Sequence, residues 1–167
     1  MKILITGGDG QVGSELKFLS FNYGTFNWVF TDKNDLDISN LDTLENKLDN
    51  ISPDLIINCA AYTDVENAEI EIELSEILNH KAVDLISKWT YNNSRKLLHF
   101  STDYVFDGSS ENPITESNRT NPLNNYGLTK LNGDLACLKN NPKSIILRTS
   151  WIYSSYGHNF VKTMYKL

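Results

Sequence analysis

"KILITGGDGQVGSEL" (residues 2–16) decides the fold of this chain. Residues 2–6 are short and apolar, as expected for a buried strand, and Gly7, Gly10 and Gly13 follow at intervals of three. Glycine loses more backbone entropy on ordering than any other residue, so three of them in one short stretch need a structural reason.

A phosphate-binding turn between a first strand and a first helix supplies that reason. Gly7 permits a sharp turn, Gly10 lets backbone N–H groups approach a pyrophosphate, and Gly13 lets the helix pack closely on the strand. The helix N-terminus adds unpaired N–H donors and the positive end of its dipole. A tight turn without a ligand is the competing interpretation.

Asp32 adds context to the glycine pattern, because it ends the next apolar stretch, residues 27–32. A carboxylate about 20 residues beyond the glycines accepts hydrogen bonds from the adenosine ribose in dinucleotide-binding folds. The two features together predict a dinucleotide site. Lys33 could pair with a 2′-phosphate, so the sequence does not separate NAD from NADP.

Strand-like and helix-like segments alternate along the whole chain. Strands are predicted at 2–6, 27–32, 53–60, 96–103 and 143–153, and helices after the glycines and at 41–48, 65–89 and 126–139. A further helix is expected to start in the last residues. This alternation predicts an α/β fold with a doubly wound parallel sheet, a Rossmann fold, in one domain over residues 1–167.

Two other segments carry specific expectations. The helix at 126–139 is expected to bury a stripe of leucines, namely Leu128, Leu131, Leu135 and Leu138. The stretch at 106–125 is rich in Asn, Ser, Gly and Pro, and its length predicts a functional loop.

The composition limits the classes of function. The formal net charge is −6, with 40% hydrophobic and 22% charged residues, which argues against nucleic-acid and membrane-surface partners. No apolar run is long enough for a membrane helix, and the N-terminus does not resemble a signal peptide. Cys59 and Cys137 lack metal-ligand spacing, so we expect buried thiols in a reducing cytoplasm and no metal site.

Tyr126 and Lys130 are the first candidates for catalysis, because positions i and i+4 share one face of the helix predicted there. A nearby ammonium lowers the pKa of a phenol and prepares it for proton transfer. A surface pair is the alternative. Ser101, Thr102 and Asp103 strengthen the catalytic interpretation, because they end a predicted parallel strand at the sheet edge where ligands bind.

Motifs spread over nearly the whole chain resemble the extended short-chain dehydrogenase/reductases and, among these, the dTDP-4-dehydrorhamnose reductase family. They are "GGDGQVGSEL" (7–16), "PDLIINCAAYTDVENAE" (53–69), "LNHKAV" (78–83), "HFSTDYVFDG" (99–108), "PLNNYGLTKLNGD" (122–134) and "LRTSWIYSSYGHNFVKTM" (147–164). The resemblance implies reduction of the C4 keto group of dTDP-4-dehydro-L-rhamnose to dTDP-L-rhamnose by NADPH or NADH, in nucleotide-sugar biosynthesis.

The resemblance also implies residue roles. The implied catalytic residues are Thr102, Tyr126 and Lys130, with Thr102, Asp103 and Trp151 contacting the sugar. The implied cofactor contacts are Gly7, Gly10, Gln11, Val12, Gly13, Asp32, Asp37, Ile38, Ala61, Tyr62 and Thr63, together with Tyr126 and Lys130. Trp151 and Tyr153 as core aromatics remain an alternative, and His99 is expected to be a satisfied core histidine.

The chain is shorter than members of that family, which continue into a smaller C-terminal domain that supplies much of the nucleotide-sugar pocket. We therefore expect that domain to be largely absent, in a fragment or a naturally short protein. The apolar surface exposed there would favour self-association, for example as a homodimer. Two alternative functions stay open: a non-catalytic dinucleotide-binding regulator of the same fold, and a relative of the sugar-nucleotide epimerases and dehydratases.

Overall fold

Five parallel strands form the centre of the computed structural model, which describes residues 1–167. They are β1 (Lys2–Thr6), β2 (Asn27–Thr31), β3 (Leu55–Asn58), β4 (Lys96–Thr102) and β5 (Ile145–Thr149). Their order in the sheet is β2-β1-β3-β4-β5. The chain places β2 on one side of β1 and then crosses to the other side, where β3, β4 and β5 follow in turn, so the switch point lies between β1 and β3. In open α/β sheets ligands bind outside the carboxyl ends of the strands at such a switch point. The predicted doubly wound Rossmann-type sheet is confirmed.

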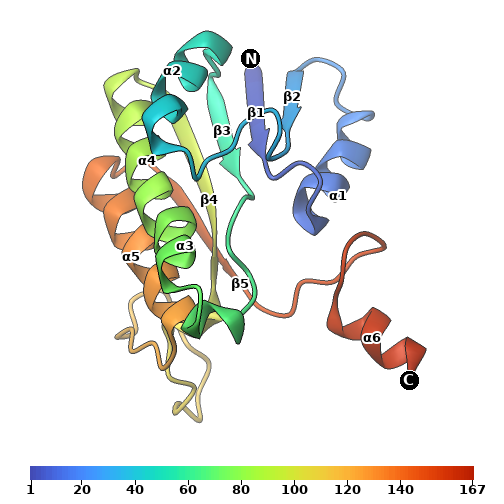
Figure 1. Cartoon of the computed structure of the whole chain (residues 1–167), viewed down its shortest axis with the longest axis vertical. Coiled ribbons are helices and arrows are strands. Elements are labelled where there is room, and N and C mark those ends of the chain that lie inside the picture. The colour runs from blue at the N-terminus through green and yellow to red at the C-terminus, as the bar shows by residue number, and fades with distance from the viewer.

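Helices lie on both faces of this sheet (Figure 1). One face carries α2 (Leu41–Ile51), α4 (Ala82–Asn92) and α5 (Asn125–Asn140), and the other carries α1 (Gln11–Ser20). The main core fills the layer under α2 and α4, with Leu4, Leu44, Leu48, Ile56, Ile86 and Leu97 almost fully buried. No helix combines the length and the apolar character needed to cross a membrane.

The helix expected at 65–89 begins later than predicted and is not uniform. A 3₁₀ turn, η1 (Asn67–Glu69), comes first, and the backbone leaves helical geometry at Glu71. A continuous helical run then passes through α3 (Ile72–Glu76), a π-helical turn η2 (Ile77–Lys81) and α4. The carboxylate of Asp64 accepts the Asn67 N–H at 3.0 Å and caps the start of η1.

The leucine stripe predicted on α5 is wrong. Leu128, Leu135 and Leu138 are exposed, and Leu131 alone of the four is buried. The buried side instead holds small and polar residues: Gly127, Thr129, Lys130, Gly133, Asp134, Ala136 and Cys137. Close packing explains why small residues lie on this side of α5, because a Cβ at Gly133 would lie 2.1 Å from the carbonyl oxygen of Asn79 in η2.

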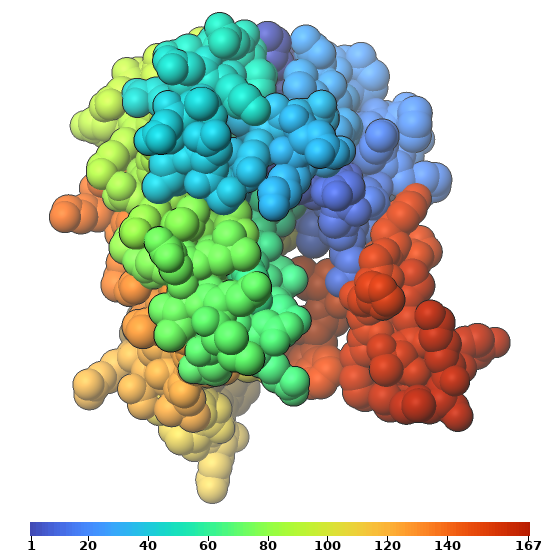
Figure 2. Space-filling model, viewed as in Figure 1, coloured from blue at the N-terminus to red at the C-terminus, as the bar shows by residue number.

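After β5, which is shorter than predicted, the chain crosses back toward its own N-terminus. Trp151 adopts a left-handed backbone with φ of +52°, a conformation uncommon for a bulky residue. The segment then runs past the β1–α1 turn into α6 (Phe160–Lys166), where Asn159 Nδ2 donates to Gln11 Oε1 at 2.9 Å. Figure 2 shows this C-terminal segment beside the N-terminal residues, with a hollow between it and the rest of the molecule.

Candidate active site

A cavity of about 700 Å³ lies at the carboxyl ends of the strands and collects nearly all predicted site residues. Its lining includes Gly7, Gly10, Gln11, Val12, Gly13, Asp32, Asp37, Ile38, Ala61, Thr63, Thr102, Asp103, Tyr126, Lys130 and Trp151. Tyr62 is the one predicted residue outside this lining. Residues separated by more than a hundred positions thus meet in one cleft.

The glycine turn has the geometry that the sequence predicts. Gly7 adopts φ of +63°, and a Cβ there would lie 2.9 Å from backbone atoms of Ala60. A Cβ at Gly13 would lie 2.3 Å from the Gly7 carbonyl oxygen, so only glycine lets α1 start this close to β1. Gln11 and Val12 begin the helix, and their end of α1 faces the cavity. The turn, the helix start and the cavity fit the diphosphate of a dinucleotide.

The far end of the cavity holds the acidic candidate for the ribose. Asp32 Oδ1 accepts backbone N–H groups from Asn34 at 2.7 Å and Asp35 at 3.1 Å. The bond from Asp35 and, after it, the bond from Asn34 lower the pKa of Asp32 and keep the carboxylate ionised. The carboxylate lies in the cavity lining, where it is available to a ribose hydroxyl. Nearby, Asp37 is held by Ser39, whose hydroxyl donates at 2.6 Å.

Tyr62 lies outside the cavity lining, and hydrogen bonds to its hydroxyl and its backbone hold it in place. Its hydroxyl donates to Glu71 Oε2 at 2.6 Å, and this bond raises the pKa of Tyr62 to about 12. Its backbone is clamped by Asn79, which accepts the Tyr62 N–H at 2.9 Å and donates to its carbonyl at 3.1 Å. Tyr62 thus holds the loop after β3 in place, while its neighbours Ala61 and Thr63 face the cavity.

Asn79 is a residue of the site region that sequence reasoning did not single out. It sits in η2, is fully buried, and also donates to Thr129 Oγ1 on α5 at 3.2 Å. It therefore ties the loop after β3 to the helix that carries Tyr126 and Lys130. Its position inside "LNHKAV" was the available signal, because a polar residue in an otherwise buried helix turn needs partners.

Thr102 and Tyr126 approach each other where β4 ends and α5 begins. Thr102 Oγ1 accepts the Tyr104 N–H at 3.2 Å, which holds the threonine side chain at the strand end. Burial raises the pKa of Tyr126, and a hydrogen bond with Thr102 opposes that rise. The sequence predicts a pKa lowered by Lys130, whereas in the structure the phenol is more buried than that prediction assumes and stays protonated.

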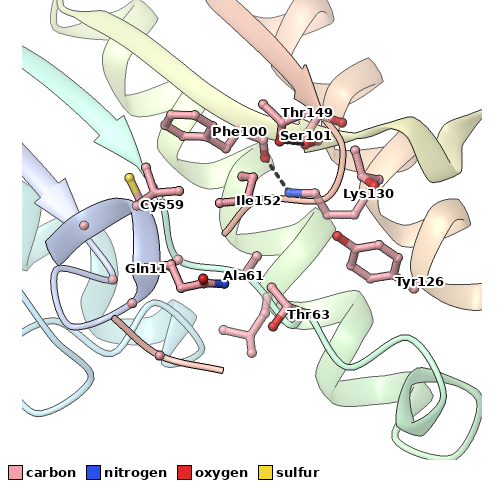
Figure 3. A pocket seen from close by; sticks show the side chains of 18 of the residues that line it. Gln11, Cys59, Ala61, Thr63, Phe100, Ser101, Tyr126, Lys130, Thr149 and Ile152 are labelled. Atoms are coloured by element: carbon pink, nitrogen blue, oxygen red, sulfur yellow. Dashed lines mark hydrogen bonds between the residues drawn. The ribbon is translucent and has the colours of Figure 1, made fainter. Parts of the chain in front are cut away.

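Lys130 is buried behind the tyrosine, and its side chain reaches from α5 toward β4 (Figure 3). Its Nζ donates to the carbonyl oxygen of Phe100 at 2.6 Å. Burial lowers the pKa of Lys130 to about 8, although the nearby carboxylate of Asp134 works in the opposite direction. An amine that changes its charge close to neutral pH can take part in proton exchange as well as in binding.

The side of the cavity next to Thr102 is formed by Asp103 and the start of the C-terminal segment. Ser150 Oγ donates to Asp103 Oδ2 at 2.7 Å, which joins the end of β4 to the residue after β5. Trp151 packs edge-on against Phe160 with ring centroids 5.0 Å apart. Trp151 and Tyr153 are exposed, so neither is a core aromatic here, and Trp151 lies at the mouth of the cavity.

The parallel sheet, the glycine turn and the Tyr126–Lys130 pair at one edge place this chain among the extended short-chain dehydrogenase/reductases. The family model described as the RmlD substrate binding domain matches residues 1–167. The chain therefore belongs to the RmlD family, and its similar curated relatives include dTDP-4-dehydrorhamnose reductases.

Individual relatives agree with this family. The dTDP-4-dehydrorhamnose reductases of Aggregatibacter actinomycetemcomitans and Salmonella typhimurium are each 41% identical, over 99% and 100% of this chain. The chain spans 56% of the length of each. The crystal structure of the Clostridium acetobutylicum enzyme superimposes with a TM-score of 0.94 at 39% identity, over 99% of this chain and 59% of that one. The crystal structure of the Bacillus anthracis enzyme in complex with NADP superimposes with a TM-score of 0.93 at 36% identity, over 99% of this chain and 58% of that one.

Proposed function

We propose that this chain forms the cofactor-binding and proton-donating part of a reductase that acts on the C4 keto group of dTDP-4-dehydro-L-rhamnose. One observation carries the proposal: Thr102, Tyr126 and Lys130 line the same cavity as the glycine turn. A proton donor and a bound dinucleotide would then both lie next to the C4 carbonyl of the substrate. The NADP complex of the Bacillus anthracis relative supports a nicotinamide cofactor.

Each side chain has a distinct part in this proposal. Reduced nicotinamide supplies the hydride that converts the C4 carbonyl to an alcohol. Thr102 and Tyr126 hydrogen-bond the carbonyl oxygen, and Tyr126 gives it a proton. The raised pKa of Tyr126 suits a donor, because the phenol is protonated before the reaction starts. Lys130 binds the nicotinamide ribose, and its charged form stabilises the phenolate as it forms.

The substrate side of the proposal rests on Asp103 and Trp151. Asp103 is held by Ser150 beside Thr102, where it can accept a sugar hydroxyl. Trp151 presents an exposed ring at the mouth of the cavity, as a platform for the sugar. Binding energy from remote parts of a substrate supports catalysis, so we expect slow turnover from a chain that spans about half of its relatives.

A direct assay tests this proposal. The chain is given NADPH and dTDP-4-dehydro-L-rhamnose, and the loss of reduced-nicotinamide absorbance is followed for the parent, Tyr126→Phe and Tyr91→Phe. Tyr91 is exposed on α4, away from the cavity, and serves as the matched control. We expect slow turnover in the parent and the control, and none in Tyr126→Phe, which still binds NADPH.

Equal turnover in all three proteins would refute the proton-donor role of Tyr126. Tight NADPH binding without oxidation in any of them would instead favour the dinucleotide-binding regulator. The two outcomes are separated by measuring NADPH affinity calorimetrically on the same preparations.

A further inference from the structure

A row of buried polar side chains crosses the sheet and ends at Lys130. Thr6, Asn58 and His99 are register partners on the neighbouring strands β1, β3 and β4. All three are almost completely buried, with at most 1% of their surface exposed. Burying three polar side chains next to one another costs free energy unless each finds partners, and these side chains bond to one another.

The hydrogen bonds of the row fix its direction. Thr6 Oγ1 accepts the Ala60 N–H at 3.3 Å, so its own proton goes to Asn58 Oδ1 at 2.6 Å. Asn58 must then present its Nδ2 to His99 Nδ1, 3.0 Å away. The opposite orientation of the amide would leave the Thr6 hydroxyl proton without an acceptor. His99 Nδ1 is therefore an acceptor, and a neutral ring carries its proton on Nε2.

That Nε2–H group faces the site lysine. His99 Nε2 lies 3.4 Å from Lys130 Nζ and 4.0 Å from Asp134 Oδ1. A charged ammonium has donors only, so it meets the His99 N–H as donor against donor, whereas an uncharged amine offers a lone pair. The backbone oxygen of Phe100 holds the amine from the other side.

We propose that His99 is a positioning residue for Lys130: the row fixes its Nε2–H toward Nζ, which holds the amine in place and favours its uncharged form. The catalytic consequence rests on the function proposed above, since an amine that exchanges its proton near neutral pH can restore the proton that Tyr126 gives up. The arrangement of the row itself does not depend on that function.

The other charged groups around Lys130 are consistent with this assignment. On α5, Asp134 is buried, and its Oδ2 is taken by the Ser101 hydroxyl and by Arg148 Nε from β5, at 2.9 and 3.2 Å. Its Oδ1 has no hydrogen-bond partner, so this oxygen attracts the Lys130 proton only from a distance. Tyr126 faces the lysine from the cavity side and is protonated. His99 resists charging because it is fully buried and lies next to Lys130, both of which lower its pKa.

Nuclear magnetic resonance on the unmodified chain gives the first test. Long-range ¹H–¹⁵N spectra of histidine-labelled protein distinguish the two neutral tautomers and the charged ring. We expect His99 to stay neutral, with its proton on Nε2, throughout the neutral pH range. A proton on Nδ1, or a charged ring, overturns the proposal without any substitution.

The second test measures Lys130 itself through the ¹³Cε resonance of lysine-labelled protein, assigned with Lys130→Met. His99→Gln is compared with His80→Gln, which changes a partly exposed histidine paired with Glu76. A glutamine amide can turn its oxygen toward Nζ, so we expect the Lys130 titration midpoint to rise by about one unit, the worth of a hydrogen bond to a charged group. His80→Gln should leave it unchanged.

A merely structural role for His99 would lower stability and leave the midpoint in place, and that result would overturn the proposal. Neither experiment needs turnover or bound dinucleotide. A failed reductase assay together with the expected spectra would therefore reject the proposed function alone, and the reverse pattern would reject the role of His99 alone.

Discussion

The glycine turn and the buried side of α5 both place functional groups at the same sheet edge, but they do so by different means. In the turn, the tightest contact joins residues that are close in sequence, Gly13 and the carbonyl of Gly7, although Gly7 also packs on the backbone of Ala60. On α5, Gly133 packs on Asn79, and Lys130 bonds Phe100. A local motif thus binds with its backbone, whereas the side-chain site exists only after distant elements have packed.

Gly133→Ala should break the α5 side of this comparison most severely. The new Cβ would lie 2.1 Å from the Asn79 carbonyl oxygen, and a backbone atom cannot move aside easily. We expect the free energy of unfolding to fall by about 3 kcal/mol, as in overpacked cores, measured by urea denaturation. Gly24→Ala is the matched control, because nothing lies within 4 Å of its Cβ. A stability equal to that of the control would show that α5 can shift away from η2.

Gly13→Ala should damage the turn while leaving α5 intact. Its Cβ would lie 2.3 Å from the Gly7 carbonyl oxygen and 2.6 Å from Gly8 Cα, so the turn must open. We expect the NADPH dissociation constant to rise about 30-fold, equivalent to about 2 kcal/mol. Calorimetric titration of the variant against Gly24→Ala measures this change, and an unaltered affinity would show that the turn does not contact the dinucleotide.

The pH dependence of stability tests how deeply α5 buries its charge. The pKa of Lys130 falls from 10.5 to about 8 on folding, so between these values the unfolded chain binds more protons than the folded one. Stability therefore rises with pH in this window. Relative to Lys130→Met, the parent should gain about 2 kcal/mol between about pH 7.5 and about pH 9.5. Parallel curves for the two proteins in urea denaturation would mean that the amine is not desolvated.

Leucine truncation on α5 should give the smallest effect and sharpens the distinction between its two sides. Leu135 is 57% exposed, so Leu135→Ala should cost less than about 0.5 kcal/mol. Leu131 is 9% exposed, so Leu131→Ala should lower the free energy of unfolding by about 2 kcal/mol. Thermal unfolding of the two variants measures the difference. Equal losses would restore the leucine stripe that periodicity predicts.

Particular residues show where prediction from the sequence succeeded. Lys2–Thr6 and the glycines after it were correctly predicted as a strand and a tight turn, because both depend on a few consecutive residues. The satisfied core histidine was also predicted correctly, since His99 is fully buried and bonds Asn58. The roles of the site residues remain predictions, although all of them except Tyr62 line one cavity.

Other residues show where prediction from the sequence was insufficient. Periodicity places the leucines of α5 inward, but the space between α5 and η2 accepts only small side chains, and the polar ones there are paired. Tyr62 was predicted to contact the cofactor; its hydroxyl bonds Glu71 and it lies outside the cavity lining, so that role stays a prediction. Neither outcome follows from local pattern, because each depends on which surface a distant element presents.

The sequence alone determined the alternation of strands and helices, the backbone of the phosphate-binding turn and the presence of a Tyr-Lys pair one helical turn apart. Tertiary structure alone decided which side of α5 is buried, how the row from Thr6 reaches Lys130, and what charge those buried groups carry. The physical reason is range: backbone sterics act between neighbouring residues, whereas desolvation and close packing depend on every element that surrounds a group.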